Sequence, residues 1–371
     1  MASAAEQTAM RRALVLAAAV LGTTNPNPAV GAVVLDELGQ PVGEGATAPV
    51  RGDHAEVVAL AAAGPRARGG SLVVSLEPCR HTGRTGPCTA VILAAGVARV
   101  VYAVADPNVR AGGGADELRR GGVEVESGLL APDAGRLLEP WLASVARRRP
   151  YVTWKYAASL DGRTAAADGT SRWITGPVAR ADVHRERALA DAVMVGIGTV
   201  LADDPELTVR DWPTNRQPVR IVVDSAARTP LHAKVFSTAA LTILAVATDV
   251  DQGRVEALRS TGAEVVGVRR DRNGLDPGAL LSALFDLEVH NVWLEGGATL
   301  AGSFVGAGLV DRVVGYYAPL LLGAGTSLVG DLGSQTLETA QRLAFDDVVR
   351  VGEDLKLVAR VCHHDAEGLP R

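Results

Sequence analysis

A histidine, a glutamate and two cysteines in the first third of the sequence have the types and spacing of a metal site. Glu56 stands two residues after His54, and Cys79 and Cys88 each follow a proline. One imidazole and two thiolates are typical zinc ligands, and three protein ligands leave the fourth position of the metal open, as in catalytic sites. We therefore interpret His54, Cys79 and Cys88 as ligands of a catalytic zinc ion.

Glu56 has the position of a proton carrier beside such a metal. Zinc lowers the pKa of a bound water to about 7, which makes hydroxide available near neutral pH. Glu56 can take the proton of that water and pass it to departing ammonia. A His-x-Glu element, a later Pro-Cys and a glutamate that is not a ligand are typical of zinc deaminases. In the nucleic-acid deaminases two residues separate the cysteines, whereas eight lie between Cys79 and Cys88.

Each of these residues also has a structural explanation. Asp53 and Glu56 would form a capping box at a helix start, and buried cysteines often serve as small apolar side chains. A structural zinc module fused to a nucleotide-binding sensor would need a fourth ligand, such as Cys362. All the residues occur together in the right order with both cysteines after proline, so we favour the catalytic site.

The elements that must position these residues follow from the hydrophobic pattern. Strands are predicted at 29–35, 71–76 and 99–104, and helices at 53–63 and 87–95. This alternation indicates a largely parallel sheet, in which strand–helix order brings the three ligands to one edge. Both helix N-termini would face the metal, where their partial positive charge favours thiolates.

The N-terminus allows two interpretations. Arg11 and Arg12 precede the apolar run 13–22, as in a signal peptide. The alternative is a helix over 4–21 that ends at Gly22 and packs on the sheet. We prefer the helix and a cytoplasmic location, because the proposed zinc site needs reduced thiols.

The chain is long enough for two domains. At about 100–200 residues per domain, 371 residues favour two, and Arg147–Pro150 has the composition of a linker. We expect an α/β domain over 1–148 and a second over 149–371. In the second, predicted strands are 151–156, 192–196, 219–223, 241–246, 265–268, 291–294 and 313–317, and predicted helices are 177–190, 253–260, 278–285 and 299–306.

Composition excludes several classes of protein. A hydrophobic content of 47% argues against disorder, and no apolar run reaches the roughly 18 residues of a membrane span. Three cysteines are too few for a disulfide scaffold. A net charge of −5 and 4% aromatic residues disfavour nucleic acid as a partner, because its binding needs a basic groove and stacking rings.

Six motifs, in family order over nearly the whole chain, resemble one enzyme family. Segments 25–31, 79–88, 155–164, 171–175, 199–205 and 294–300 are similar to the bifunctional riboflavin biosynthesis proteins, in which a pyrimidine deaminase is fused to a reductase. The resemblance implies an N-terminal cytidine-deaminase-like α/β/α domain and a C-terminal dihydrofolate-reductase-like α/β domain. The Gly-x-Gly-x-x-Gly fingerprint of the classical dinucleotide fold does not occur.

The resemblance implies two reactions on one phosphorylated pyrimidine. The first removes the 2-amino group of a diaminopyrimidinone that carries a ribosylamino 5′-phosphate, with zinc on His54, Cys79 and Cys88 and with Glu56 as proton shuttle. The second reduces the ribosyl group to ribityl with NADPH. It further implies a homo-oligomer, either a dimer or a tetramer. Family members usually have histidine, serine and proline where Thr47, Arg80 and Gly86 stand here.

The resemblance also assigns reductase residues position by position. It places NADP on Ala157, Trp173, Thr199, Asp203, Ser225 and the turn Gly297, Ala298, Thr299, Leu300, Ala301, Gly302 and Ser303. It places the substrate on Ser171, Arg187, Leu207, Arg210 and Glu295. We expect the catalytic residue Lys155, one of three lysines, to steer the ribosyl group, with Glu295 or Asp203 supplying proton chemistry.

Some of these residues have ordinary alternatives. Arg187 could be a solvated helix charge, Trp173 a core residue, and the glycines before Ala298 a plain strand-to-helix turn. We assign no catalytic role to the histidines other than His54, and we interpret Cys362, His363 and His364 as part of a C-terminal tail and not as a metal site.

Overall fold

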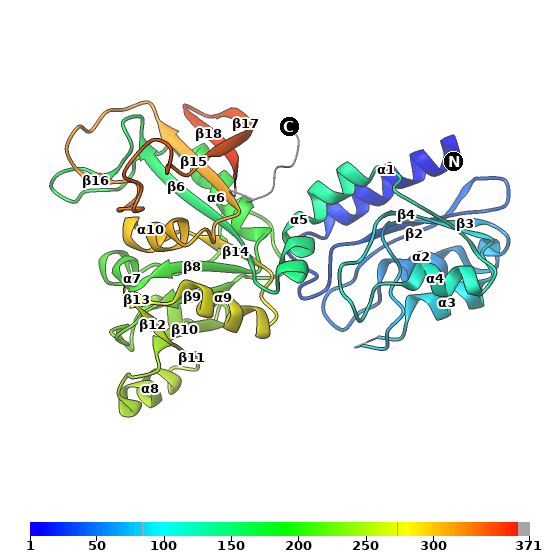
Figure 1. Cartoon of the computed structure of the whole chain (residues 1–371), viewed down its shortest axis with the longest axis horizontal. Helices are drawn as coiled ribbons and strands as arrows, with labels where there is room; N and C mark the ends of the chain where they lie inside the picture. The colour runs from blue at the N-terminus through cyan, green and yellow to red at the C-terminus, as the bar shows by residue number, and fades with distance from the viewer. Residues whose placement is uncertain (84, 273, 363–371) are drawn as a thin grey trace. The chain divides into compact units, whose positions relative to one another are not determined.

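The computed structural model describes residues 1–83, 85–272 and 274–362, and most of its elements are labelled in Figure 1. The chain divides into two compact units, one from Met1 to Arg149 and one from Pro150 onward. This division lies one residue from the boundary predicted at 148. His363 and His364 lie outside the described residues. No helix in the described part of the chain is long and apolar enough to cross a membrane.

The first unit is built on a five-stranded sheet with the order β2-β1-β3-β4-β5. Its elements are α1 Ala4–Ala19, β1 Gly31–Leu35, β2 Pro41–Ala46, α2 Ala55–Ala63, β3 Ser71–Leu76, α3 Cys88–Ala95, β4 Arg99–Val104, α4 Gly114–Arg120, β5 Glu124–Ser127 and α5 Ala131–Arg147. A short 3₁₀ helix, Gly64–Ala67, follows α2.

The prediction of a largely parallel sheet is wrong for this unit. Strands β3, β4 and β5 are parallel, but β1 is antiparallel to both β2 and β3. The connection from β1 to β2 is a tight turn in which the Asp36 carboxylate accepts the N–H groups of Leu38 and Gln40. So short a connection can join only antiparallel strands, because a parallel pair needs a crossover of a dozen residues or more.

Helices cover both faces of this sheet, with α1 and α5 on one face and α2, α3 and α4 on the other (Figure 1). The apolar run that resembles a signal peptide contributes residues 13–19 to α1, and this helix buries Met10 and Ala13 against the sheet. A capping box between Ser3 and Glu6 begins this helix.

Two glycines of β2 let α2 lie directly on the strand. A Cβ atom at Gly43 would stand 2.3 Å from the carbonyl oxygen of Ala59, and one at Gly45 would stand 2.4 Å from that of Ala55. Both distances are far inside van der Waals contact, so no larger residue fits there without moving the helix. The approach fixes the height of α2 above the sheet, and α2 begins next to His54.

The second unit contains a nine-stranded sheet with the order β11-β10-β9-β8-β14-β6-β15-β18-β17. Its helices are α6 Pro177–Ala188, α7 Ile197–Asp203, α8 Gln252–Arg259, α9 Pro277–Asp286 and α10 Ala298–Gly306, with a 3₁₀ turn at Lys234–Phe236. The sheet strands are β6 Tyr151–Ser159, β8 Ala192–Gly196, β9 Val219–Val223, β10 Thr242–Ala247, β11 Glu264–Val268, β14 Asn291–Leu294, β15 Arg312–Ala318, β17 Leu343–Val351 and β18 Asp354–Val361. Short pairs join β7 Arg163–Ala165 to β16 Thr326–Ser327 and β12 Arg270–Asp271 to β13 Gly274–Leu275.

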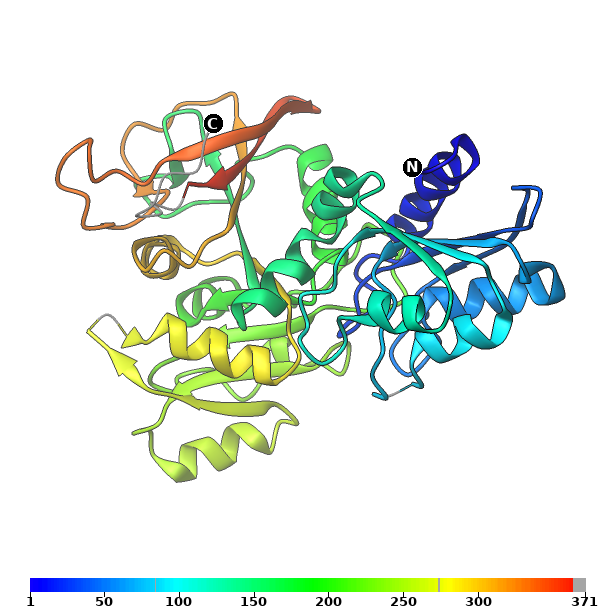
Figure 2. The same ribbon diagram turned by 45° about the vertical axis from the view of Figure 1, so that its right-hand side comes forward.

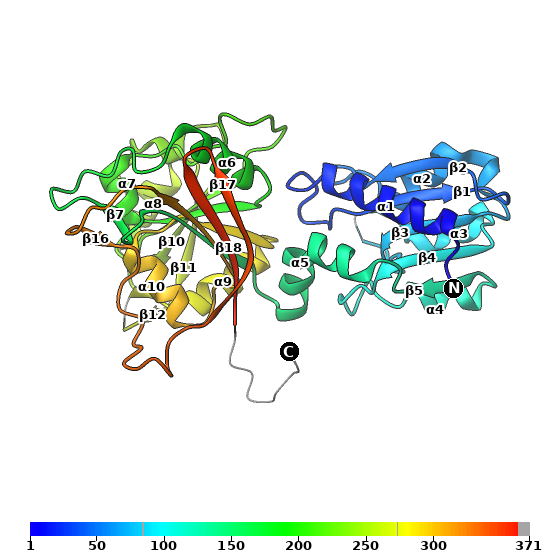
Figure 3. The same ribbon diagram turned by 90° about the horizontal axis from the view of Figure 1, so that it is seen from above.

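Seven strands of this sheet are parallel, from β11 to β15, and β18 is antiparallel to both β15 and β17. Helices α9 and α10 pack on one face and α6, α7 and α8 on the other, and Figure 2 shows α9 lying along its face of the sheet. The hairpin β17–β18, red in Figure 3, ends the sheet and was not predicted.

Candidate active sites

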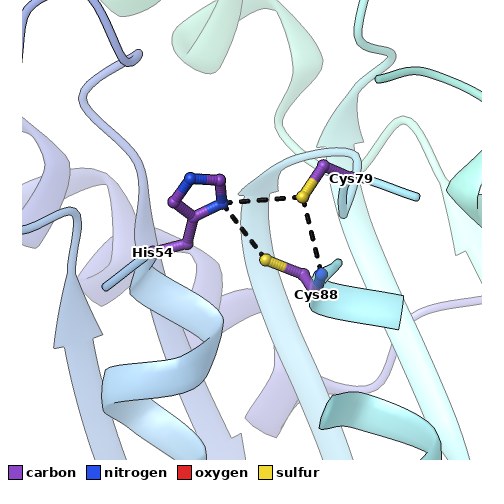
Figure 4. Close-up of side chains that lie close together, drawn as sticks. All are labelled: His54, Cys79 and Cys88. Carbon is purple, nitrogen blue, oxygen red and sulfur yellow. Dashed lines mark hydrogen bonds between the residues drawn. The ribbon is translucent and has the colours of Figure 1, made fainter. Parts of the chain in front are cut away.

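The three predicted zinc ligands converge in the first unit (Figure 4). The Nδ1 atom of His54 lies 3.2 Å from the Cys88 sulfur and 3.6 Å from the Cys79 sulfur. The ligand atoms of all three residues lie within 4.8 Å of one another. They form the one such group of at least three histidine, cysteine or acidic residues in the part of the chain that the structure describes.

Each ligand stands at the end of an element. His54 is the N-cap residue of α2, Cys88 is the first residue of α3, and Cys79 follows β3 after Glu77 and Pro78. The predicted capping box of Asp53 and Glu56 is wrong: the N-cap is His54, and it makes no side-chain capping bond. Helix α3 likewise begins at Cys88, one residue after the predicted start.

Glu77, two residues before Cys79, ties this segment to residues 106–115, which lead from β4 into α4. Its buried carboxylate accepts the N–H groups of Asp106, Gly113 and Ala115 at 3.2, 3.1 and 3.0 Å. Burial, together with the charges of Glu77 and Cys79, raises the pKa of Asp106 to about 6. Thr47 is also buried and bonds the backbone of Val30 through its hydroxyl.

The electrostatics of the cluster suit a cation. A hydrogen bond from Cys88 and the neighbouring His54 lower the pKa of Cys79, so that Cys79 is the first of the two thiols to ionise. Burial raises the pKa of Glu56, whose carboxyl group lies against Cys88. Two sulfurs and one imidazole nitrogen, brought together in a largely buried pocket, fit zinc by number and by donor type. Cys362 is exposed and lies outside this group.

The second unit holds a cavity of about 810 Å³. Twelve of the residues predicted to bind NADP or substrate, or to act in catalysis, line it: Lys155, Ala157, Ser171, Trp173, Arg187, Thr199, Asp203, Leu207, Arg210, Glu295, Gly297 and Ala298. The lining does not include Ser225 or Thr299–Ser303. Ser225 follows β9, where its carbonyl accepts a bond from Arg270, and Thr299–Ser303 continue α10 away from Gly297.

Glu295 is the centre of the charged groups in this cavity. Both of its oxygens accept bonds from Arg187, Trp293 Nε1 donates to Oε1 at 2.9 Å, and Lys155 Nζ donates to Oε2 at 3.4 Å. Burial opposes ionisation, but Arg187 and Lys155 outweigh it and hold the pKa of Glu295 well below its usual range. The Arg187 and Glu295 side chains are 12% and 11% exposed, so the interpretation of Arg187 as a solvated helix charge is wrong.

Trp173 is an exposed wall of the cavity. Its side chain is 69% exposed, which excludes the core alternative, and the Arg180 guanidinium lies 4.5 Å from its ring. On the neighbouring α7, Asp203 accepts a bond from Arg172 at 2.7 Å.

Sequence reasoning missed three lining residues in particular, Arg172, His184 and Lys234. His184 had been given no role, although it precedes Arg187 by three residues and therefore lies on the same helix face. Lys234 is one of only three lysines, and scarcity was the one available signal.

Two family models match the chain. The model for the RibD C-terminal domain matches residues 150–357, and that for the cytidine and deoxycytidylate deaminase zinc-binding region matches residues 3–104. The chain is 47% identical over 348 residues to the riboflavin biosynthesis protein RibD of Mycobacterium tuberculosis. The aligned residues cover 92% of this chain and 94% of the relative. It is 40% identical to the RibD protein of Escherichia coli, over 94% of this chain and 97% of the relative.

Solved structures agree with these matches. Acinetobacter baumannii RibD superposes with a TM-score of 0.87 at 35% identity, over 96% of this chain and 99% of that one. A second structure superposes with a TM-score of 0.84 at 32% identity, with the same coverage of both chains. It is a diaminohydroxyphosphoribosylaminopyrimidine deaminase/5-amino-6-(5-phosphoribosylamino)uracil reductase from Thermotoga maritima.

The fold and the two sites define a zinc-dependent deaminase joined to an NADPH-dependent reductase. The chain belongs to the RibD family and is a bifunctional enzyme of riboflavin biosynthesis. It uses Zn²⁺ and NADPH as cofactors, and its substrate is a small molecule.

Proposed function

We propose that the first unit deaminates 2,5-diamino-6-ribosylamino-4(3H)-pyrimidinone 5′-phosphate and that the second reduces the product to 5-amino-6-ribitylaminouracil 5′-phosphate. The convergence of His54, Cys79 and Cys88 beside the buried Glu56 carries the first half of the proposal. The Glu295 cluster, in a cavity that is also lined by Arg210, carries the second half. The relative from Thermotoga maritima bears both activities in its name.

In the deaminase, His54, Cys79 and Cys88 would hold the zinc ion, which supplies Lewis acidity and an activated water when bound. Water adds to the ring carbon that carries the 2-amino group. Glu56 takes a proton from that water and delivers it to the amino nitrogen. The C–N bond then breaks, ammonia leaves and a carbonyl group remains, so that the hydrolysis is balanced without another reactant.

In the reductase, NADPH supplies the hydride and the chain positions the acceptor. Arg210 is suited to an anionic sugar phosphate, because a guanidinium group binds phosphate oxygens in a bidentate manner. The guanidinium of Arg187 is bound to Glu295, so Arg187 would serve the substrate by holding that carboxylate in the cavity. Lys155 makes one bond to Glu295, and its ammonium group has three donors, so it can also hold the ribosyl oxygen. The proton that completes the reduction would come from the group of Lys155 and Glu295, or from Asp203.

The NADP role of Thr199, Asp203, Ala157 and Trp173 is supported by their place on the cavity wall. The same role for Ser225 and Thr299–Ser303 rests on the family resemblance, since these residues lie outside that lining.

A coupled assay on the diaminopyrimidinone phosphate, following ammonia and NADPH separately, tests the two assignments. Cys88→Ser should abolish ammonia release and leave NADPH oxidation on the deaminated intermediate unchanged. Lys155→Met should abolish NADPH oxidation on the deaminated intermediate and leave ammonia release unchanged. If either variant stops both reactions, or neither, the assignment of one reaction to each unit is overturned.

The edge strand β17 supports a homo-oligomer, either a dimer or a tetramer. It pairs only with β18 among the described strands, and its apolar Leu343, Phe345 and Val348 are exposed, Phe345 by 67%. Exposed apolar edge strands tend to pair with another chain. Sedimentation should give a multiple of 38.4 kDa for the native chain and a smaller species for Phe345→Glu.

We also propose a cytoplasmic location, because zinc thiolates and NADPH need a reducing compartment; cell fractionation tests it.

A further inference from the structure

The segment Leu207–Arg210 carries two of the proposed substrate ligands and is buried without belonging to a helix or strand. Leu207, Thr208 and Val209 are at most 5% exposed, and the segment follows α7 as irregular backbone. Buried backbone N–H and C=O groups need hydrogen-bond partners, and regular structure supplies none here.

Side chains from two other places supply these partners. Gln217 bonds both backbone groups of Val209: its Oε1 accepts the N–H at 2.7 Å and its Nε2 donates to the carbonyl at 3.0 Å. From α6, Arg187 donates to the Thr208 carbonyl at 3.1 Å, and His184 Nδ1 accepts the Arg210 N–H at 3.3 Å.

The backbone of this segment requires such support. Leu207 has a φ of 56°, in the left-handed region that a residue with a Cβ atom avoids. The conformation persists only where surrounding contacts determine it. Its consequence is to turn the chain so that Leu207 and Arg210 both line the cavity.

The His184 bond depends on the protonation state of the ring. Nδ1 can accept a hydrogen bond only in the neutral tautomer whose proton is on Nε2. Nε2 faces Asp211, with the Oδ2 atom 4.0 Å away, while burial and then the charges of Arg187 and Arg210 lower the pKa of the ring. The buried ring is therefore kept as an acceptor.

We propose that His184 and Gln217 are positioning residues of the reductase, which hold the backbone of Leu207–Arg210 so that Arg210 meets the substrate phosphate. Neither side chain needs to touch the substrate. The inference rests on the proposed role of Arg210 in substrate binding and adds the two groups through which that arginine is placed.

Hydrogen exchange in the full-length protein measures the placement directly. His184→Ala should speed exchange of the Arg210 amide, and Gln217→Leu, which removes the acceptor of the Val209 N–H, should speed exchange of the Val209 amide. His184→Asn, whose carbonyl oxygen can still accept, should restore protection at Arg210. Unchanged exchange in His184→Ala, or no restoration by His184→Asn, overturns the positioning role.

Kinetics on the deaminated intermediate gives the second readout. His184→Ala and Gln217→Leu should raise the KM for this substrate by about tenfold, as expected for the loss of a buried hydrogen bond. The KM for NADPH and the ammonia release of the deaminase should stay within twofold. An equal rise in the KM for NADPH would mean general damage to the unit and overturn the inference.

Arg210→Gln separates this inference from the proposed function. If its substrate KM equals that of the native enzyme, the role of Arg210 fails, and the exchange data still decide whether His184 and Gln217 hold the segment. If Arg210→Gln raises the KM while His184→Ala and Gln217→Leu do not, the role of Arg210 stands and the positioning inference fails.

Discussion

Arg187 binds both carboxylate oxygens of Glu295, with Nη2 donating to Oε2 at 2.9 Å and Nε donating to Oε1. The pair joins α6 to the end of β14, and both side chains are nearly buried. A buried ion pair is costly to break from one side only, because the remaining charge has no partner.

Glu295→Gln should therefore destabilise the reductase unit by about 3 kcal/mol at pH 7, since it leaves Arg187 and Lys155 without their common carboxylate. The pKa of Glu295 is lowered in the folded protein, so its stabilising effect is complete above the unfolded pKa of about 4.3 and is lost as pH falls through the lower folded value. Denaturant unfolding from pH 7 to pH 3 checks this. Glu256→Gln, which removes an exposed ion pair with Arg259, is the control and should change stability by less than about 0.5 kcal/mol. The difference in the free energy of unfolding between the native protein and Glu295→Gln should shrink toward pH 3. A difference that grows would contradict the stabilising role of the Glu295 carboxylate.

Glu56→Gln should keep zinc and lose ammonia release. The amide preserves the shape of the side chain but cannot carry a proton between water and the leaving nitrogen, a function worth about 10²–10⁴-fold in rate. Metal analysis and an ammonia assay measure the two effects. NADPH oxidation on the deaminated intermediate should be unaffected, and ammonia release near the native rate would refute the shuttle.

Removal of zinc with a chelator should stop deamination and spare reduction, since the only cluster of metal-ligand type among the described residues lies in the first unit. Cys362→Ala should retain zinc, because this exposed cysteine is not part of the cluster. Cys88→Ser should lose it. Loss of zinc from Cys362→Ala would instead favour a closed structural site with four protein ligands.

The reductase should bind its substrate more weakly as the pH falls. Burial lowers the pKa of His184, Arg187 and Arg210 lower it further, and Asp211 and Glu295 partly oppose them. His184 is thus fully in the neutral form that accepts the Arg210 N–H above about pH 6.5. This form is lost as the pH falls through the lower pKa that His184 has in the folded protein. The substrate phosphate titrates as well, so the comparison is with His184→Asn, which cannot protonate in this range. From pH 8 to pH 5 the substrate KM should rise by more in the native enzyme, and parallel profiles would contradict the prediction.

The sequence was informative wherever a strand or helix stood next to a chemically distinctive residue. Strands β8, β9 and β14 have the bounds that were predicted, and His54, Cys79 and Cys88 lie together as their places at element ends required. Family membership, the two activities and both cofactors were predicted from motifs and are confirmed by the relatives.

Other features had no local signal. Strand β2 contains three small residues among six, and its pairing is decided by the tight turn before it and by α2 above it. The β17–β18 hairpin has exposed apolar residues where alternation would be expected. Gln217 and His184 bond the backbone of Val209 and Arg210 through their side chains, and no periodicity of the sequence indicates these bonds.

The contact of α2 with Gly43 and Gly45 has a consequence for the metal centre. His54 is carried at the end of a helix whose height above the sheet is set by the absence of two side chains. A single methyl group at Gly45 would lift that end of the helix and carry the imidazole away from the two sulfurs, although Gly45 is not one of the three ligands. The zinc site is thus sensitive to mutation at positions outside its ligands, where only a glycine leaves room for the helix.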